Sequence, residues 1–206
     1  MAVHVVDHPL ASHLLTGLRD RTTDPSRYRQ LAWTLSTILI LEATRSLPVR
    51  TQPIMTPLEP HEGQVLGQSL AVVPVLRAGL SMLEPALQLF PDVAVGYIGL
   101  ERSHETAIAH SYYCKLPNLL DRFTLLVDPM LATGGSAAQA ASLLKAHGAS
   151  KIVMACVIAT PAGVETLQSA HPDIDVFTGA IDRELDPRRY ILPGLGDYGD
   201  RLYGTL

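Results

Sequence analysis

A regular alternation of short apolar runs and helical patterns over residues 70–181 constrains the fold most strongly. Apolar runs lie at 70–76, 93–100, 123–127, 152–159 and 176–181, and helical spacing at 80–90, 136–147 and 161–170. Continuous apolar runs are typical of parallel strands that crossover helices cover on both faces. The sequence therefore predicts an α/β fold with a Rossmann-like parallel sheet flanked by helices.

Composition supports one domain built around an aliphatic core. Hydrophobic residues make up 47% of the 206 residues, whereas aromatic residues make up only 5%. Leu, Val, Ile and Ala must therefore fill the interior of the sheet and its helices. A chain of this length corresponds to one domain of the larger kind.

Three further segments are predicted from local signals. Asp24-Pro25 reads as a cap and first turn of a helix that ends before Leu47-Pro48. Residues 48–68 contain four prolines, which predicts extended or looped chain outside the regular core. Residues 107–116 read as extended chain that leaves the sheet and returns.

Charge and cysteine content exclude several classes of protein. The net charge is −4 and 17% of residues are charged, which argues against a nucleic-acid binder that works by bulk basic charge. Cys114 and Cys156 form neither a disulfide framework nor a zinc motif, so we expect a reducing cytoplasm, with Cys114 as a buried small hydrophobe. We expect no secretory signal at the start, and the longest uncharged stretch, 129–144, is too short and glycine-rich to span a membrane.

Polar residues follow three of the predicted strands. Arg77 follows the run at 70–76, Arg102 follows the run at 93–100, and Asp128 follows the run at 123–127. Ligands of open parallel sheets bind beyond the carboxyl ends of the strands, so these side chains are expected at one edge. A guanidinium is a permanently charged, bidentate donor to phosphate. The edge is therefore a candidate phosphate site.

The sharpest motif begins at Asp128 and opens a helix. It comprises Asp128, Pro129, Met130, Leu131, Ala132, Thr133, Gly134, Gly135 and Ser136. Glycines let the backbone approach a ligand, and the helix start with the Thr133 and Ser136 hydroxyls makes a phosphate site. The spacing is not that of a nucleoside triphosphatase loop. On turn chemistry alone, an ordinary strand-to-helix turn capped by Thr133 stays open.

Residues 127–136 resemble the 5-phospho-α-D-ribose 1-diphosphate (PRPP) loop of the type I phosphoribosyltransferases. The sequence Val-Asp-Pro-Met-Leu-Ala-Thr-Gly-Gly-Ser is similar to that of the uracil phosphoribosyltransferase family, and blocks at 6–10, 73–80, 159–163 and 191–201 agree. The resemblance implies that uracil and PRPP are converted to UMP and diphosphate with Mg²⁺. It implies PRPP contacts by Arg77, Arg102, residues 128–136 and Asp197, with Arg77, Arg102 and Asp128 as catalytic residues.

The C-terminal stretch 194–199 matches Gly-x-Gly-x-x-Gly, but only seven residues follow it, which leaves no room for a dinucleotide-binding unit. The resemblance instead implies a base-recognition loop. In it, backbone groups of Ile191, Gly196 and Tyr198 pair with uracil, and Asp197 lies near the magnesium and diphosphate. Asp197 would act on the metal only indirectly, through substrate-bound Mg²⁺.

The resemblance also implies an architecture and partners. We expect a single domain with a core of about residues 65–182, a hood from about 1–64 and 183–206, and an extended β-arm. We expect uracil and PRPP as partners, a homo-oligomer (dimer or tetramer), GTP as a candidate activator, and neither nucleic acid nor membrane.

Departures from the family pattern keep alternatives open. Ser103-His104 follow Arg102 where many relatives have acidic or amide residues, Tyr198 replaces a residue that is small in bacterial relatives, and residues 182–189 differ. One alternative is a phosphoribosyltransferase for another nucleobase. The other is a pyrimidine-responsive RNA-binding regulator on the same fold, which the net charge and the presence of only three lysines disfavour.

Overall fold

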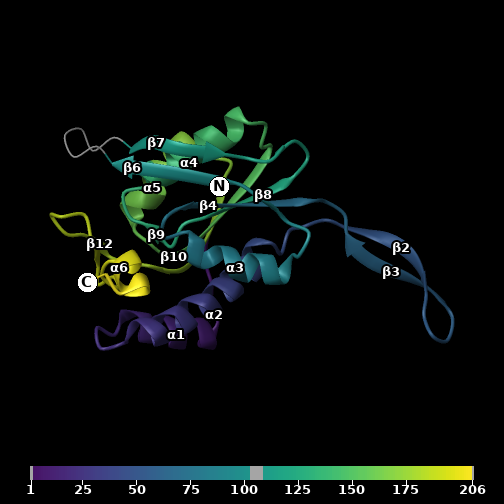
Figure 1. The fold of residues 1–206 in the computed structure, drawn as a ribbon, viewed down its shortest axis with the longest axis horizontal. Coiled ribbons are helices and arrows are strands. Elements are labelled where there is room, and N and C mark those ends of the chain that lie inside the picture. The colour runs from purple at the N-terminus through teal and green to yellow at the C-terminus, as the bar shows by residue number, and fades with distance from the viewer. Residues whose placement is uncertain (1, 103–108, 206) are drawn as a thin grey trace.

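A central sheet forms the middle layer of the computed structural model, which describes residues 2–102 and 109–205, without the side chains of 101–102 and 109–111 (Figure 1). Its strands run in the order β1-β11-β10-β8-β4-β6-β7, with β5 beside β4 and β9 beside β10. They are β1 Val3–Val5, β4 Leu70–Leu76, β5 Ala94–Val95, β6 Tyr97–Arg102, β7 Ala109–Lys115, β8 Phe123–Val127, β9 Met130–Leu131, β10 Lys151–Ala159 and β11 Asp175–Ile181. All pairs are parallel except β6 with β7, which confirms the predicted parallel sheet.

Local signals mark several of the helix ends. They are α1 Pro9–Arg19, α2 Pro25–Ala43, α3 Leu80–Leu89, α4 Gly135–Ala146, α5 Pro161–Ala170 and α6 Tyr198–Tyr203. The Asp24 carboxylate accepts hydrogen bonds from the first turn of α2, and the Thr160 hydroxyl accepts one from the first turn of α5. Gly148, with φ of 90°, follows the end of α4 in the left-handed conformation that is common there. No helix within the described ranges is long and apolar enough to cross a membrane.

Helices cover both faces of the sheet (Figure 1). Phe123, Leu125 and Val127 of β8 join the apolar cluster that contains the buried side chains of α1, α2 and α3. Leu126 faces the opposite way and packs with the buried side chains of α4 and α5. Because successive side chains of a strand point to opposite faces, one apolar run supplies both cores.

The sheet begins earlier in the chain than the sequence predicts. β1 pairs in parallel with β11 at the edge of the sheet, and α2 packs on β10, so residues expected in the hood belong to the central layers. The hydrophobic pattern of the sequence does not reveal β1, because this strand is only three residues long and has His4 at its centre. The run at 93–100 is also two strands, β5 and β6, which separate at Gly96.

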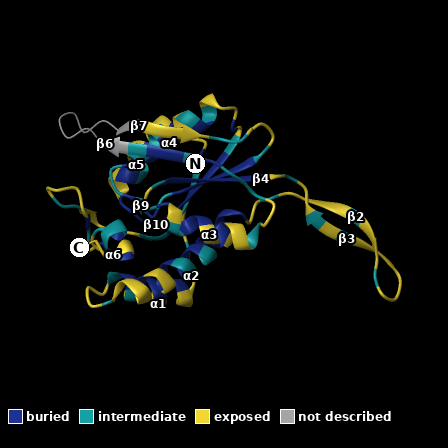
Figure 2. Cartoon of the chain, in the orientation of Figure 1, coloured by how far each residue is buried: buried dark blue, intermediate teal, exposed yellow. Residues whose placement is uncertain are grey.

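Residues 48–68 lie outside the core, as predicted, but they form a regular antiparallel hairpin. Strands β2 (Val49–Met55) and β3 (Pro60–Leu66) pair along their whole length and project from the molecule (Figure 1). Their residues are almost all exposed (Figure 2). A second small sheet joins β12 (Glu184–Leu185) to β13 (Ile191–Leu192) near the C-terminus.

Of the segment at 107–116, expected to leave the sheet and return, residues 109–115 form β7, which pairs antiparallel with β6. Ser103 and His104 lie outside the described residues. Cys114 on β7 is exposed, whereas Cys156 on β10 is buried, so the expectation that Cys114 is a buried hydrophobe is wrong. β7 is the edge strand of the sheet, and its residues from Tyr112 to Lys115 are all exposed.

Candidate active site

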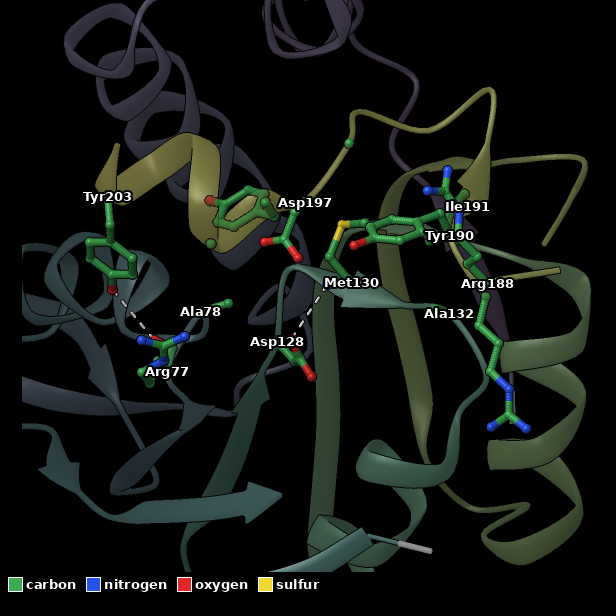
Figure 3. A pocket seen from close by; sticks show the side chains of 14 residues that line it. Arg77, Ala78, Asp128, Met130, Ala132, Arg188, Tyr190, Ile191, Asp197 and Tyr203 are labelled. Atoms are coloured by element: carbon green, nitrogen blue, oxygen red, sulfur yellow. Dashed lines mark hydrogen bonds between the residues drawn. The ribbon is translucent and has the colours of Figure 1, made fainter. Parts of the chain in front are cut away.

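A cavity of about 400 Å³ opens where β4 and β8 end (Figure 3). Pro74 of β4 pairs with Val127 of β8, so Arg77 and Asp128 leave neighbouring strands at the same edge. The cavity is lined by Arg77, Ala78, Asp128, Met130, Ala132, Arg188, Arg189, Tyr190, Ile191, Gly196, Asp197, Tyr198, Gly199 and Tyr203. Its volume is that of a small-molecule site.

Arg77 is the first residue after β4, at the mouth of the cavity. The Leu76–Arg77 peptide bond is cis, and the Tyr203 hydroxyl lies 3.5 Å from the Arg77 carbonyl oxygen (Figure 3). Gly79 follows where a Cβ atom would come within 2.6 Å of the carbonyl oxygens of Val75 and Val127. Only glycine therefore allows the chain to turn so closely over the strand ends.

Asp128 is half-buried at the end of β8, where its carboxylate accepts a hydrogen bond from the Met130 N–H at 3.4 Å. Met130 and Leu131 form β9, which pairs with Ile158 and Ala159 of β10. This pairing buries the Leu131 side chain, so Leu131 offers a ligand only its backbone. Met130 and Ala132 line the cavity.

The loop then opens into α4 in a conformation that requires glycine. Gly134 has φ of 78°, and a Cβ atom there would lie 2.4 Å from the Gly163 carbonyl oxygen. Gly134, not Thr133, is the N-cap, and it makes no side-chain capping hydrogen bond. A Cβ atom on Gly135 would meet only the Thr133 hydroxyl, at 3.9 Å. The space beside Gly135 at the helix start is therefore open, and a helix N-terminus with open space beside it suits an anion.

The block at 159–163 supports this loop from behind. The Thr160 hydroxyl donates to the Ala132 carbonyl at 2.6 Å and accepts from the Gly163 N–H at 3.0 Å. A Cβ atom on Gly163 would lie 2.4 Å from the Leu131 carbonyl oxygen. Thr160 and Gly163 thus fix the loop without entering the cavity.

The opposite wall of the cavity comes from residues 191–199, which we name the base loop. Gly194 and Gly196 have φ of 61° and 77°. Asp197 caps α6, its carboxylate accepting from the Asp200 N–H at 2.9 Å. In Figure 3 the Asp197 carboxylate points into the cavity from the side opposite Asp128. Distant parts of the chain thus place two carboxylates at one site.

Tyr198 contributes little surface to the cavity. Its side chain is 2% exposed, its hydroxyl lies 2.9 Å from Ser81 Oγ, and its ring packs edge-on against Tyr28. Burial raises the pKa of the Tyr198 phenol, so the hydroxyl stays neutral. The aromatic side chain at this position therefore packs mainly against Tyr28 and Ser81.

The cavity brings together eight of the residues expected at the site. They are Arg77, Asp128, Met130, Ala132, Ile191, Gly196, Asp197 and Tyr198. Pro129, Leu131 and residues 133–136 do not line it. Arg102 is the last residue of β6, and its side chain is not among those that the structure describes. Pro129 and Leu131 are buried.

Sequence reasoning missed the basic and aromatic residues just before the base loop. Arg188, Arg189 and Tyr190 line the cavity, and Tyr190 N–H donates to the Asp186 carboxylate, which lowers the pKa of Asp186. The sequence feature that could have indicated them is the pair of adjacent arginines shortly before Ile191. This pair lies in the segment 182–189, which differs from the family pattern.

The acids that line the cavity are Asp128 and Asp197. Within the described ranges, no group of three or more His, Cys, Asp or Glu is placed to hold a metal ion. Mg²⁺ in phosphate sites needs one or two carboxylates, with substrate oxygens and water as its other ligands. The donor set therefore fits a Mg²⁺ that arrives with a phosphorylated substrate.

Comparison with known proteins points to one family. The model of the uracil phosphoribosyltransferase family matches residues 5–205. The chain is 50% identical over 205 residues to a uracil phosphoribosyltransferase of Dictyoglomus thermophilum, covering 98% of this chain and 99% of that protein. The solved structure of the AQ2163 protein from Aquifex aeolicus superposes with a TM-score of 0.93 at 34% identity, over 98% of both chains.

A more distant structure shares the fold. The orotate phosphoribosyltransferase of Mycobacterium tuberculosis, solved in complex with PRPP, superposes with a TM-score of 0.52 at 13% identity. The match covers 86% of this chain and 95% of that one.

Proposed function

The chain belongs to the uracil phosphoribosyltransferase family, and from this premise we propose which of its residues carry the reaction. The enzyme joins N1 of uracil to C1 of the ribose in PRPP and releases diphosphate, giving UMP. The N1–C1 bond forms, the bond from C1 to the diphosphate oxygen breaks, and uracil loses its N1 proton. The cavity at the ends of β4 and β8 is the proposed site of these events.

One observation carries the assignment: the strand-end residues Arg77 and Asp128 and the base loop line one cavity, and the segment that begins at Asp128 runs directly into the start of α4 at Gly134–Gly135. The N–H groups at the start of α4 and the Thr133 and Ser136 hydroxyls suit the 5-phosphate. Asp128 then accepts hydrogen bonds from the ribose hydroxyls. The related orotate enzyme with bound PRPP supports a PRPP site on this fold.

Uracil recognition is proposed to rest on backbone groups of the base loop. Ile191, Gly196 and Tyr198 line the cavity, and Tyr198 is almost fully buried. A pyrimidine edge with alternating carbonyl and N–H groups matches backbone N–H and carbonyl groups. This geometry favours uracil over cytosine, whose amino group replaces one acceptor.

Catalysis is proposed to proceed by positioning and electrostatics. As the bond to diphosphate breaks, C1 becomes cationic and negative charge grows on the leaving group. Arg77 and Arg102 stabilise that charge, and the protein must also keep water away from the cationic ribose. Asp128 holds the ribose so that C1 faces uracil N1.

Mg²⁺ is the proposed cofactor. When bound, the ion neutralises charge on the diphosphate. Asp197 is the side chain proposed to hold it, indirectly through the substrate-bound ion, because its carboxylate points into the cavity.

We also propose that the enzyme is a homo-oligomer, because the β2–β3 hairpin projects from the molecule with almost all of its residues exposed. Val49 and Leu66 pair on one face, and Met55 lies on the same face; these side chains are 61%, 47% and 73% exposed. An isolated two-stranded hairpin is at best marginally stable in water. A second copy packed against this face would cover its apolar residues, in a dimer or a tetramer.

The remaining assignments are proposals from the family. They are a single phosphoribosyltransferase domain, activation by GTP, and action in the cytoplasm, which the two free cysteines support.

Absorbance or radiolabel assays with uracil, PRPP and Mg²⁺ test the site. Wild-type protein is expected to form UMP, and variants at Arg77 and Asp128 are expected to lose turnover while remaining folded. Hypoxanthine, adenine, xanthine and orotate in the same assay test base choice. Turnover that survives loss of both side chains would contradict the assigned site.

A further inference from the structure

The Gly194 peptide in the base loop is held from both sides by an ion pair that does not line the cavity. The Arg19 guanidinium of α1 pairs with the Asp182 carboxylate, with N–O distances of 2.6 and 2.7 Å. Arg19 also donates to the Gly194 carbonyl at 2.8 Å, and Asp182 accepts from the Gly194 N–H at 2.9 Å. Both groups of one residue in the loop are therefore bound by charged partners.

Gly194 is a position where the backbone needs such support. Its φ is 61°, and a Cβ atom would lie 2.0 Å from the Ile191 carbonyl oxygen, so the chain turns back tightly on itself. Two residues later the chain reaches Gly196, and then Asp197 and Tyr198 at the cavity. A shift of Gly194 therefore moves the backbone groups that face the ligand.

The ion pair is largely shielded from solvent, so its main effect is to fix the position of the loop. The Asp182 side chain is 5% exposed and that of Arg19 is 26% exposed. Asp182 directly follows β11, and its own N–H donates to the Ala159 carbonyl at 2.8 Å, which ties it to the sheet. Bidentate pairing between a guanidinium and a carboxylate fixes orientation as well as distance.

A second arginine fastens the same loop to α1. The Arg201 guanidinium of α6 donates to the carbonyls of Leu195 and, at the end of α1, Leu18 and Asp20. It lies over the Tyr28 ring at 4.5 Å from the centroid. The last carbonyls of a helix lack partners within the helix, so Arg201 satisfies them while it binds the loop.

We propose that Arg19 and Asp182 are positioning residues for the nucleobase. They hold the Gly194 peptide between the end of α1 and the end of β11, and thereby fix the backbone groups of Gly196 and Tyr198 that meet uracil. The proposal rests on the proposed role of the base loop. It requires that loosening this pair weakens uracil binding and leaves the PRPP side of the cavity unchanged.

The test compares steady-state kinetics of matched double variants. R19M/D182L replaces the pair with apolar side chains, which avoids leaving one buried charge without its partner. R45M/E42L removes the Arg45–Glu42 pair at the C-terminal end of α2, whose arginine side chain is 75% exposed, and serves as the control. Thermal melts establish that both variants are folded, and KM is measured separately for uracil and for PRPP.

R19M/D182L is expected to raise the KM for uracil roughly tenfold or more, because hydrogen bonds to charged groups are lost at the loop. The KM for PRPP is expected to stay within about twofold of wild type. D182N, which keeps the volume of Asp182 and one acceptor oxygen, is expected to give a smaller rise and stands in if the double variant does not fold. Equal KM values for uracil in R19M/D182L and R45M/E42L, or an equal rise for PRPP, would overturn the proposal.

G196V separates this proposal from the assignment of the base loop. It alters the loop itself, at a residue with φ of 77°. If G196V raises the KM for uracil and R19M/D182L does not, the positioning role is wrong and the base loop stands. If G196V leaves that KM unchanged, the assignment of the loop is wrong, and the positioning role falls with it.

Discussion

The Tyr198 hydroxyl lies 2.9 Å from Ser81 Oγ, and Ser81 in turn donates to the Ala78 carbonyl at 2.9 Å. Since Ser81 has a single proton to donate, the Tyr198 hydroxyl donates to Ser81. This chain of hydrogen bonds joins the base loop to the turn that carries Arg77. The Tyr198 ring itself packs edge-on against Tyr28.

Tyr198→Phe is therefore expected to leave base choice unchanged. The variant loses one buried hydrogen bond, which predicts a fall of about 1 kcal/mol in the free energy of unfolding. Denaturant titration measures that change, and the ratio of kcat/KM for uracil to that for cytosine measures base choice. Tyr112→Phe, at an exposed tyrosine on β7, is the control for stability. An altered preference in Tyr198→Phe would show that the hydroxyl takes part in base recognition.

Two adjacent glycines are expected to respond differently to valine. Gly134→Val places a side chain against the Gly163 carbonyl at a φ of 78°, so it should destabilise the fold. Gly135→Val projects into open space, so it should keep the fold and obstruct the phosphate of PRPP. Melting temperature and KM for PRPP separate the two effects. A folded Gly135→Val enzyme with normal KM for PRPP would contradict the phosphate site.

Met55→Glu on the β2–β3 hairpin is expected to weaken the oligomer. Met55 is 73% exposed on the face that carries Val49 and Leu66, and a buried unpaired carboxylate there opposes association. Light scattering after size exclusion gives the mass, with Arg50→Glu on the other face of the hairpin as the control. A wild-type mass equal to the 22.3 kDa of one chain would contradict the oligomer.

The two cysteines are expected to differ in reactivity. Burial raises the pKa of the Cys156 thiol to about 12, so at pH 8 it stays protonated, whereas Cys114 is exposed. Iodoacetamide at pH 8 should therefore label one cysteine in the native protein and two in denaturant, as counted by mass spectrometry. Because the folded pKa lies above the unfolded value of about 8.5, this thiol lowers stability as pH rises from there toward 12. Rapid double labelling of native protein would contradict its burial.

The sequence predicts the parts of the fold that local pattern controls. Continuous apolar runs identify β4, β8, β10 and β11, and Asp24 and Thr160 mark the helices they cap. β1 is missed because three residues with a central histidine have no readable period. The pairing of β2 with β3 is missed because the prolines at 48–60 obscure the alternation of the strands.

The residues of the candidate site also fall into those that the sequence pattern predicts and those that only the folded chain brings together. Arg77 and Asp128 were predictable because parallel strands bring their carboxyl ends together. Arg188, Arg189 and Tyr190 enter the cavity through the path of the chain between β12 and β13, which no local pattern specifies. The ion pair of Arg19 with Asp182 joins residues 163 positions apart, and only the folded chain shows it.

Turnover of Asp128→Asn in the uracil, PRPP and Mg²⁺ assay tests the central claim most directly. The change keeps the size of the side chain and removes the charge that the ribose hydroxyls are proposed to meet. We expect a folded protein with kcat lowered roughly 100-fold, while Asp92→Asn, at an exposed turn, keeps wild-type turnover. Wild-type turnover in folded Asp128→Asn would contradict the proposed site.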